Sequence, residues 1–225
     1  MGRVALKLSL IISLLLAPAL ASGDSFTPVP CLDSGDRSFL QIKVVKYTGG
    51  TSASMIVEVR NGGPLAETFA AKGLYFVPAD VPIEGPERPP QRVVAAGPFV
   101  NVKSKGSATQ VSVAPGKTVK LELRTFCLDA HRPSPRRTQS FKVATERLPA
   151  DLRGRIEQGT ADILKRTKGD LRARMEIQSL VWRARGAKWI KLQGERPGES
   201  AHRSTTTPHS SHGGFYITPP SQHAR

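Results

Sequence analysis

The feature that most restricts the fold of this chain is a two-residue alternation of apolar and polar side chains across residues 39–143. The segments FLQIKVVKY, SASMIVEVR, TQVSV and KTVKLELRTFCL all show it, and Gly- or Pro-containing segments such as NGGP and APGK separate them. Successive side chains of a β-strand point to opposite faces of its sheet, so each segment reads as a strand with one buried face. Short alternating strands with turns between them predict a mainly β, antiparallel sandwich or barrel over residues 22–145.

Two of these segments also carry a family resemblance. IVEVRNGG, followed by VSVAPGKTVKLEL, resembles the secreted immunoglobulin-like modules of bacterial surface proteins, over about ninety residues. The resemblance implies an antiparallel immunoglobulin-like β-sandwich. It implies little about activity, because one fold supports many functions.

After Thr145 the apolar spacing changes to three, four and seven residues, which predicts a basic helical extension over residues 146–192. We expect helices at residues 149–168 and 170–185, divided by Gly169, and a last short strand in AKWIKLQGE. The apolar stripe should pack on the sandwich and leave the charges in solvent, although such a helix can also lie on a membrane surface. Its members are Leu148, Leu152, Ile156, Ile163, Leu164, Leu171, Met175 and Trp182.

The two ends of the chain read as segments outside the fold. Arg3 and Lys7 precede an apolar stretch at residues 8–17, and Ala19-Leu20-Ala21 is a small-residue cleavage site. This pattern predicts a signal peptide at residues 1–21 and export to the periplasm, the cell surface or the medium. Residues 193–225 are rich in Ser, Thr, Pro, Gly and His, which predicts a disordered tail.

The charge of the chain favours anionic partners. It has 33 Lys and Arg against 18 Asp and Glu, a formal net charge of +15. For an exported protein we expect an anionic envelope polymer or an acidic partner protein, with peripheral membrane contact as an alternative and nucleic acid least expected. The segment HRPSPRR is the predicted anion-binding site, because Arg binds phosphate or carboxylate oxygens in a bidentate fork. Its candidate residues are His131, Arg132, Arg136 and Arg137.

The chain contains two cysteines, Cys31 and Cys127. In an exported protein an even number of cysteines predicts a disulfide. The strand parity of Leu121 and Leu123 places Cys127 on the core face, and Cys31 precedes the first long strand. We therefore expect a Cys31–Cys127 bridge that joins the first and last strands of the sandwich.

A second resemblance gives Cys127 another role. FCLD at residues 126–129 and IQSLVW at residues 177–182 resemble the paired motifs of bacterial thioester domains, which are surface adhesins. The resemblance implies an internal thioester between the Cys127 sulfur and the Gln178 side chain, which would capture a nucleophile on another surface. A disulfide excludes that bond. We favour the bridge, under which Gln178 is an ordinary helix residue and Trp182 anchors the core.

The sequence carries no recognisable catalytic or metal-binding motif. GxSxG, SxxK, HExxH, GxGxxG and the phosphate-binding loop are all missing. The tail histidines lack a ligand framework, so we predict no enzyme activity, no cofactor and no metal; they are His202, His209, His212 and His223. The leading hypothesis is an exported non-enzymatic binding module. The alternatives are the thioester adhesin and an accessory subunit of a secretion, motility or polysaccharide-export assembly.

Overall fold

The computed structural model describes residues 25–32, 37–50, 52–79, 89–187 and 190–195. Within them the protein is mainly β and its strands pair antiparallel, which confirms the predicted fold class at that level. The predicted signal peptide at residues 1–21 and the part of the predicted tail beyond Glu195 lie outside the described residues. The elements are β1 (Thr27–Pro28), β2 (Leu40–Tyr47), β3 (Ser54–Asn61), β4 (Glu67–Ala70), β5 (Tyr75–Pro78), β6 (Val93–Ala95), β7 (Phe99–Asn101), β8 (Ser107–Ala108), β9 (Gln110–Val113), β10 (Thr118–Cys127), β11 (Phe141–Val143), α1 (Ala150–Arg166) and α2 (Asp170–Ala187).

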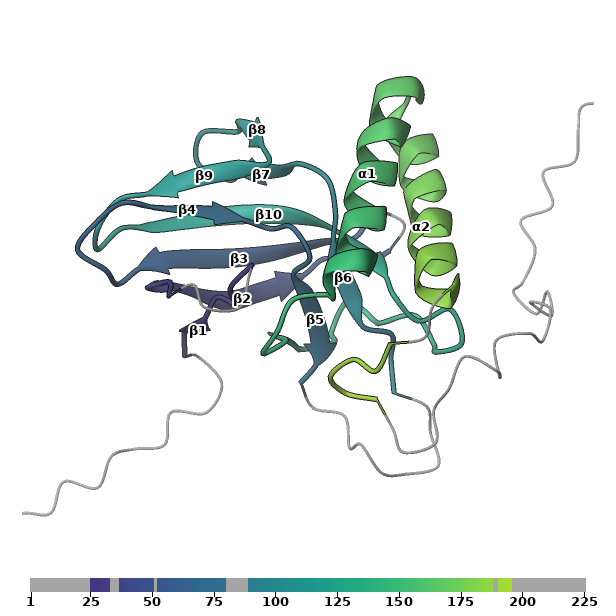
Figure 1. Ribbon diagram of the computed structural model, residues 1–225, viewed down its shortest axis with the longest axis horizontal. Helices are drawn as coiled ribbons and strands as arrows, with labels where there is room; N and C mark the ends of the chain where they lie inside the picture. The colour runs from purple at the N-terminus through teal and green to yellow at the C-terminus, as the bar shows by residue number, and fades with distance from the viewer. Residues whose placement is uncertain (1–24, 33–36, 51, 80–88, 188–189, 196–225) are drawn as a thin grey trace, which may run out of the picture.

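Two sheets and a pair of helices make up the fold (Figure 1). The larger sheet has the order β1-β2-β3-β10-β6-β5-β11, with β7 and β8 paired beside β10. The strands β4 and β9 form the second sheet. The helices stand side by side at the end of the long strands where β10 meets β6.

The long strand β10 connects both halves of the sheet. Its residues 118–124 pair with β3, and residues 125–127 pair with β6. Its side chains Leu121, Leu123 and Thr125 are buried and Cys127 is half-buried against the same core, so the predicted parity is confirmed. Phe126, on the opposite face, belongs to a second apolar cluster. The end of β10 is therefore covered on both faces.

The second apolar cluster is where the helices pack on the sheet. Leu152, Ile156 and Ile163 of α1 are buried there against strand residues such as Tyr75 and Val94, as the predicted stripe requires. Gly169 separates the helices with φ 90°, a left-handed conformation that suits glycine. The predicted last strand is wrong, because residues 190–195 contain no strand; they form a turn that buries Leu192.

The predicted stripe of α2 is also wrong. Leu171, Met175 and Trp182 are 57%, 65% and 38% exposed, so Trp182 is not a core anchor. The buried face has smaller or β-branched side chains: Ala173, Ile177, Val181 and Ala184. The helices also approach closely at Gly159, where an added Cβ would lie 2.6 Å from Leu180 Cδ2. Close helix contact selects small side chains and leaves the bulky ones outside.

The predicted Cys31–Cys127 disulfide does not form. β1 pairs near the start of β2, level with the start of β10, and the chain runs on from there to Cys31. Cys127 is the last residue of β10, and nine residues of strand span roughly 30 Å. A disulfide requires Cα atoms within about 7 Å. Cys31 lies between Pro30 and Leu32, whose carbonyls bind Arg147 and Arg153 near the start of α1, whereas Cys127 lies against Gln178 of α2, so no bridge joins the two cysteines.

A buried ion pair joins the sheet to the helical side. Arg92 and Asp129 have fully buried side chains, and Arg92 Nε and Nη2 donate to the Asp129 carboxylate over 2.7 and 2.5 Å. Arg92 also donates to the Gln193 carbonyl over 3.1 Å and contacts Glu195, which is bound by Arg185 of α2. The residue directly before β6, the turn after β10, α2 and residues 190–195 thus meet at one charged cluster.

The charge of Asp129 is fixed by its neighbours. Burial alone would raise its pKa, but the hydrogen bonds and positive charge of Arg92, with Arg132 beside it, hold the pKa of Asp129 below its usual value. Burial likewise opposes the charge of Arg92, yet Asp129 raises its pKa. Both groups are therefore ionised in the fold, and each compensates the buried charge of the other.

We expect Asp129→Asn to destabilise the protein by about 3–5 kcal/mol, because it leaves Arg92 buried without its counter-charge. The free energy of unfolding from denaturant titration is the measurement. Asp162→Asn, on the exposed face of α1, is the control and should change stability by less than about 0.5 kcal/mol. Because the pKa of Asp129 is depressed, its contribution is present above the ordinary Asp pKa and is lost as pH falls through the folded value. Equal effects of the two variants would contradict the assignment.

Candidate functional site

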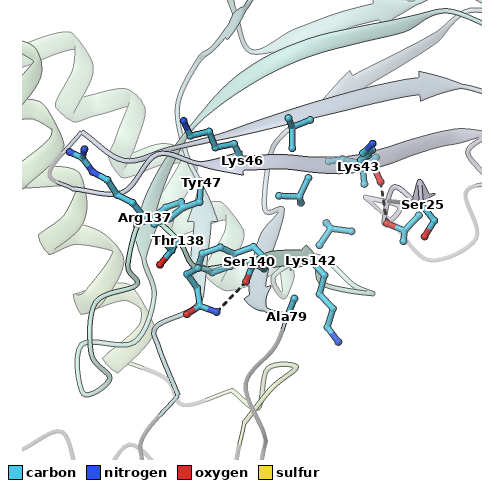
Figure 2. Close-up of a pocket in the computed structure, with 16 residues that line it drawn as sticks. Ser25, Lys43, Lys46, Tyr47, Ala79, Arg137, Thr138, Ser140 and Lys142 are labelled. Atoms are coloured by element: carbon cyan, nitrogen blue, oxygen red, sulfur yellow. Dashed lines mark hydrogen bonds between the residues drawn. The ribbon is translucent and has the colours of Figure 1, made fainter. Parts of the chain in front are cut away.

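A basic groove lies between β2 and β11, with a volume of about 600 Å³. We define the basic groove by its four cationic side chains. Lys43 and Lys46 belong to β2, Arg137 lies in the turn before β11, and Lys142 belongs to β11. Among the described residues that line it, no side chain is acidic. Figure 2 shows the groove with these side chains around it.

Three local features build the groove. β2 has a register shift between Val44 and Lys46, which bends this edge of the sheet. The rings of Tyr47 and Phe141, 5.0 Å apart, hold β2 beside β11 although the two strands do not pair. Gly49 has φ 68°, and a Cβ there would overlap the Arg137 side chain, so this glycine gives Arg137 its place at the groove.

The cationic groups do not converge on one point. In Figure 2, Lys46 and Arg137 extend towards one side of the groove and Lys142 towards the other. Hydroxyl-bearing side chains also line the groove, among them Ser25, Thr138 and Ser140. Burial, and the nearby Cys127, raise the pKa of Tyr47 to about 12, so its hydroxyl stays neutral. The groove therefore offers separated positive charges together with neutral hydrogen-bonding groups.

The four anion-binding residues predicted from HRPSPRR do not form one site in the structure. Arg137 lines the basic groove, whereas Arg136 is exposed and His131 is half-buried, and neither lines it. Arg132 is wrong as an anion contact, because it is 4% exposed, donates to the Gly194 carbonyl over 3.0 Å and lies 3.9 Å from Asp129. It serves the buried cluster instead.

Sequence reasoning missed the three lysines of the basic groove. Lys43 and Lys46 lie in β2 and Lys142 lies about a hundred residues later, so no local charge cluster marks them. The available signal was weaker: Lys43 and Lys142 are at polar positions of alternating segments, and Lys46 is at an apolar position that a register shift in β2 brings to the groove. Only the approach of β11 to β2 brings them together.

The structure also brings Cys127 and Gln178 together. Cys127 N donates to Gln178 Oε1 over 2.9 Å, and Gln178 Nε2 donates to the Cys127 carbonyl over 2.8 Å. The carboxamide thus binds the backbone of Cys127 as a neighbouring strand would. This contact begins where β3 no longer pairs with β10. The last hydrogen bond between the β3 side and β10 joins Thr125 N to the Ala53 carbonyl. Gln178 is therefore not an ordinary helix residue: it docks α2 on β10.

The sulfur of Cys127 is a protonated thiol at neutral pH. Burial, followed by the negative charge of Asp129, raises the pKa of Cys127 to about 11. A raised pKa lowers the thiolate fraction, and the thiolate is the reactive form. The local environment therefore does not activate Cys127 as a nucleophile.

The described residues contain no candidate metal site and no candidate membrane span. No group of three His, Cys, Asp or Glu side chains there is placed to hold a metal ion, and the tail histidines lie outside the described part. No helix in the same residues is long and apolar enough to cross a bilayer. Comparison of the chain with family models, curated proteins and solved structures gives no match.

We expect Gln178→Leu to destabilise the protein by about 1–3 kcal/mol, because it leaves the N–H and C=O of Cys127 without their partners. The amide hydrogen of Cys127 should also exchange faster. Gln158→Leu, on the exposed face of α1, is the matched control and should leave this exchange rate unchanged. An unchanged rate in Gln178→Leu would show that the pair does not persist in solution.

Proposed function

We propose that this protein is an exported, non-enzymatic binding module, and that an anionic polymer lies in the basic groove. The immunoglobulin-like character of the sandwich and the export signal are parts of this proposal that come from the sequence. The observation that carries it is the set of four cationic side chains around one groove with no acidic side chain among its described lining residues.

The spacing of the charges supports a polymer over a small anion. A single phosphate or sulfate is best held by donors that converge on it. Here Lys46 and Arg137 lie at one side and Lys142 at the other, so an extended ligand can contact them in turn. Ser25, Thr138 and Ser140 add hydroxyl groups to the lining of the same groove. This combination suits a chain that carries both negative charges and hydroxyls, such as an acidic polysaccharide.

The test is charge reversal with a matched control. Lys46→Glu, Arg137→Glu and Lys142→Glu together should weaken binding to an immobilised acidic polysaccharide roughly a hundredfold, since each cation near an anionic surface contributes about 1 kcal/mol. The control combines Arg155→Glu, Lys165→Glu and Lys168→Glu, which changes the net charge equally on exposed parts of the helical region. Binding is measured as affinity over a series of salt concentrations, and it should fall steeply with salt.

The outcome separates three cases. If only the groove variant loses affinity, the basic groove is the binding site. If only the helix variant does, the polymer binds the helical surface and the groove assignment fails. Equal losses of affinity in the two variants would show that binding depends only on the net charge of the protein. Binding of the unchanged chain that does not depend on salt would contradict a polyanion ligand.

A thioester between Cys127 and Gln178 is the second candidate, and the contact between these residues favours it. In that reaction the sulfur attacks the Gln178 carboxamide carbon, an S–C bond forms, the C–N bond breaks and ammonia leaves with the thiol proton. Against it, the carboxamide is bound to the backbone of Cys127, and the raised pKa disfavours the thiolate. Docking of α2 accounts for the same contact without a reaction.

Intact-mass measurement decides between the two. A thioester lowers the mass of the purified chain by one ammonia and makes it react with methylamine. We expect the full mass of the unreacted thiol and no methylamine adduct. A deficit of one ammonia that persists in Cys31→Ser and disappears in Cys127→Ser would establish the thioester and overturn this expectation.

A further inference from the structure

A second groove, on the outer face of α2, is apolar. It has a volume of about 560 Å³ and lies between α2 and the chain around the end of β10. We call it the α2 groove and define it by Cys127, Pro135, Leu171, Met175 and Trp182. The three helix residues among them are the exposed apolar side chains of α2.

The helix geometry makes these three side chains one surface. Leu171, Met175 and Trp182 are four and seven residues apart, so they lie along one face over roughly 16 Å of helix. The packing of α2 on the rest of the protein uses a different face. Large contiguous patches of exposed apolar side chains are uncommon on monomeric proteins, and such patches often mark binding surfaces.

The sequence beyond the described residues contains one segment of matching chemistry. After Glu195, Phe215, Tyr216 and Ile217 are the only three consecutive apolar residues, in a stretch otherwise rich in Ser, Thr, Pro, Gly and His. Two glycines precede them and Pro219 and Pro220 follow. Proline favours extended backbone and lowers the conformational entropy lost on binding.

The described chain ends close to the α2 groove. Glu195 is bound to Arg185, which is one turn of α2 beyond Trp182, about 4.5 Å along the helix axis. About 20 residues separate Glu195 from Phe215, and a chain of that length can span up to roughly 60 Å. The segment therefore reaches the groove easily. Tethering gives it an effective concentration in the millimolar range, so weak contacts are sufficient.

We propose that residues 215–217 of the same chain dock in the α2 groove, with their apolar side chains against Leu171, Met175 and Trp182. The tail then covers the apolar face of α2 and shields Cys127. This inference is independent of the ligand of the basic groove, since it rests on a different surface.

Methionine methyl groups provide a selective probe. The chain has three methionines, of which Met175 is 65% exposed in the α2 groove and Met55 is fully buried in the sandwich core. The test compares the full chain with Phe215→Ala, Tyr216→Ala and Ile217→Ala combined, using nuclear magnetic resonance of isotope-labelled methionine methyls. The matched control combines His209→Ala, Ser210→Ala and Ser211→Ala.

The Met175 signal should shift in the first variant and stay in place in the control, while the Met55 signal stays in place in both. In a Cys31→Ser background, alkylation of Cys127 should be several-fold faster in the first variant, because its cover is lost. An unchanged Met175 signal and an unchanged alkylation rate would overturn the proposal. A Met175 shift that disappears on dilution would also overturn it, since it would assign the groove to the tail of a second copy.

Discussion

The ion pair between Arg92 and Asp129 is the constraint on which the arrangement of the layers depends. Both charges are completely buried, so neither is tolerable without the other. The pair fixes the turn after β10 to β6, and through Glu195 and Arg185 it fixes residues 190–195 to α2. Two polar contacts thus attach the helical side to the sheet. The first is the charged cluster that includes Arg185 of α2, and the second is the pair of hydrogen bonds between the Gln178 carboxamide and the backbone of Cys127.

This attachment also determines what remains on the surface. With α2 held by its small-residue face and by Gln178, its bulky side chains are left outward beside Cys127. Tyr47 lies at the boundary, because it lines both the basic groove and the α2 groove. A charged surface and an apolar surface therefore share one wall near the end of β2. The two proposed interactions, with an anionic polymer and with the tail, would take place side by side.

Local patterns predicted the elements better than they predicted contacts between them. The alternation in residues 39–143 predicted the strands and the parity of Cys127, and the helical spacing after Thr145 predicted the buried stripe of α1, because each follows from the repeat of a single strand or helix. The predicted disulfide was wrong because the positions of distant segments cannot be read from strand alternation: Cys31 lies near the start of α1, whereas Cys127 lies against α2. Arg132 failed as an anion contact because its partner, Asp129, is buried with Arg92, a residue far away in sequence.

The sequence by itself determined the period-two strands, the change to helical spacing after Thr145 and the large excess of positive charge, since these are properties of neighbouring residues and of composition. It also pointed to Cys127 and Gln178 as a pair, without revealing that their contact runs through the backbone. Only the tertiary structure decided which cations gather at a groove, which become structural and which face of α2 is covered. These outcomes depend on burial, and the free energy of burying a charge or an apolar side chain is set by partners that the chain brings together from a distance.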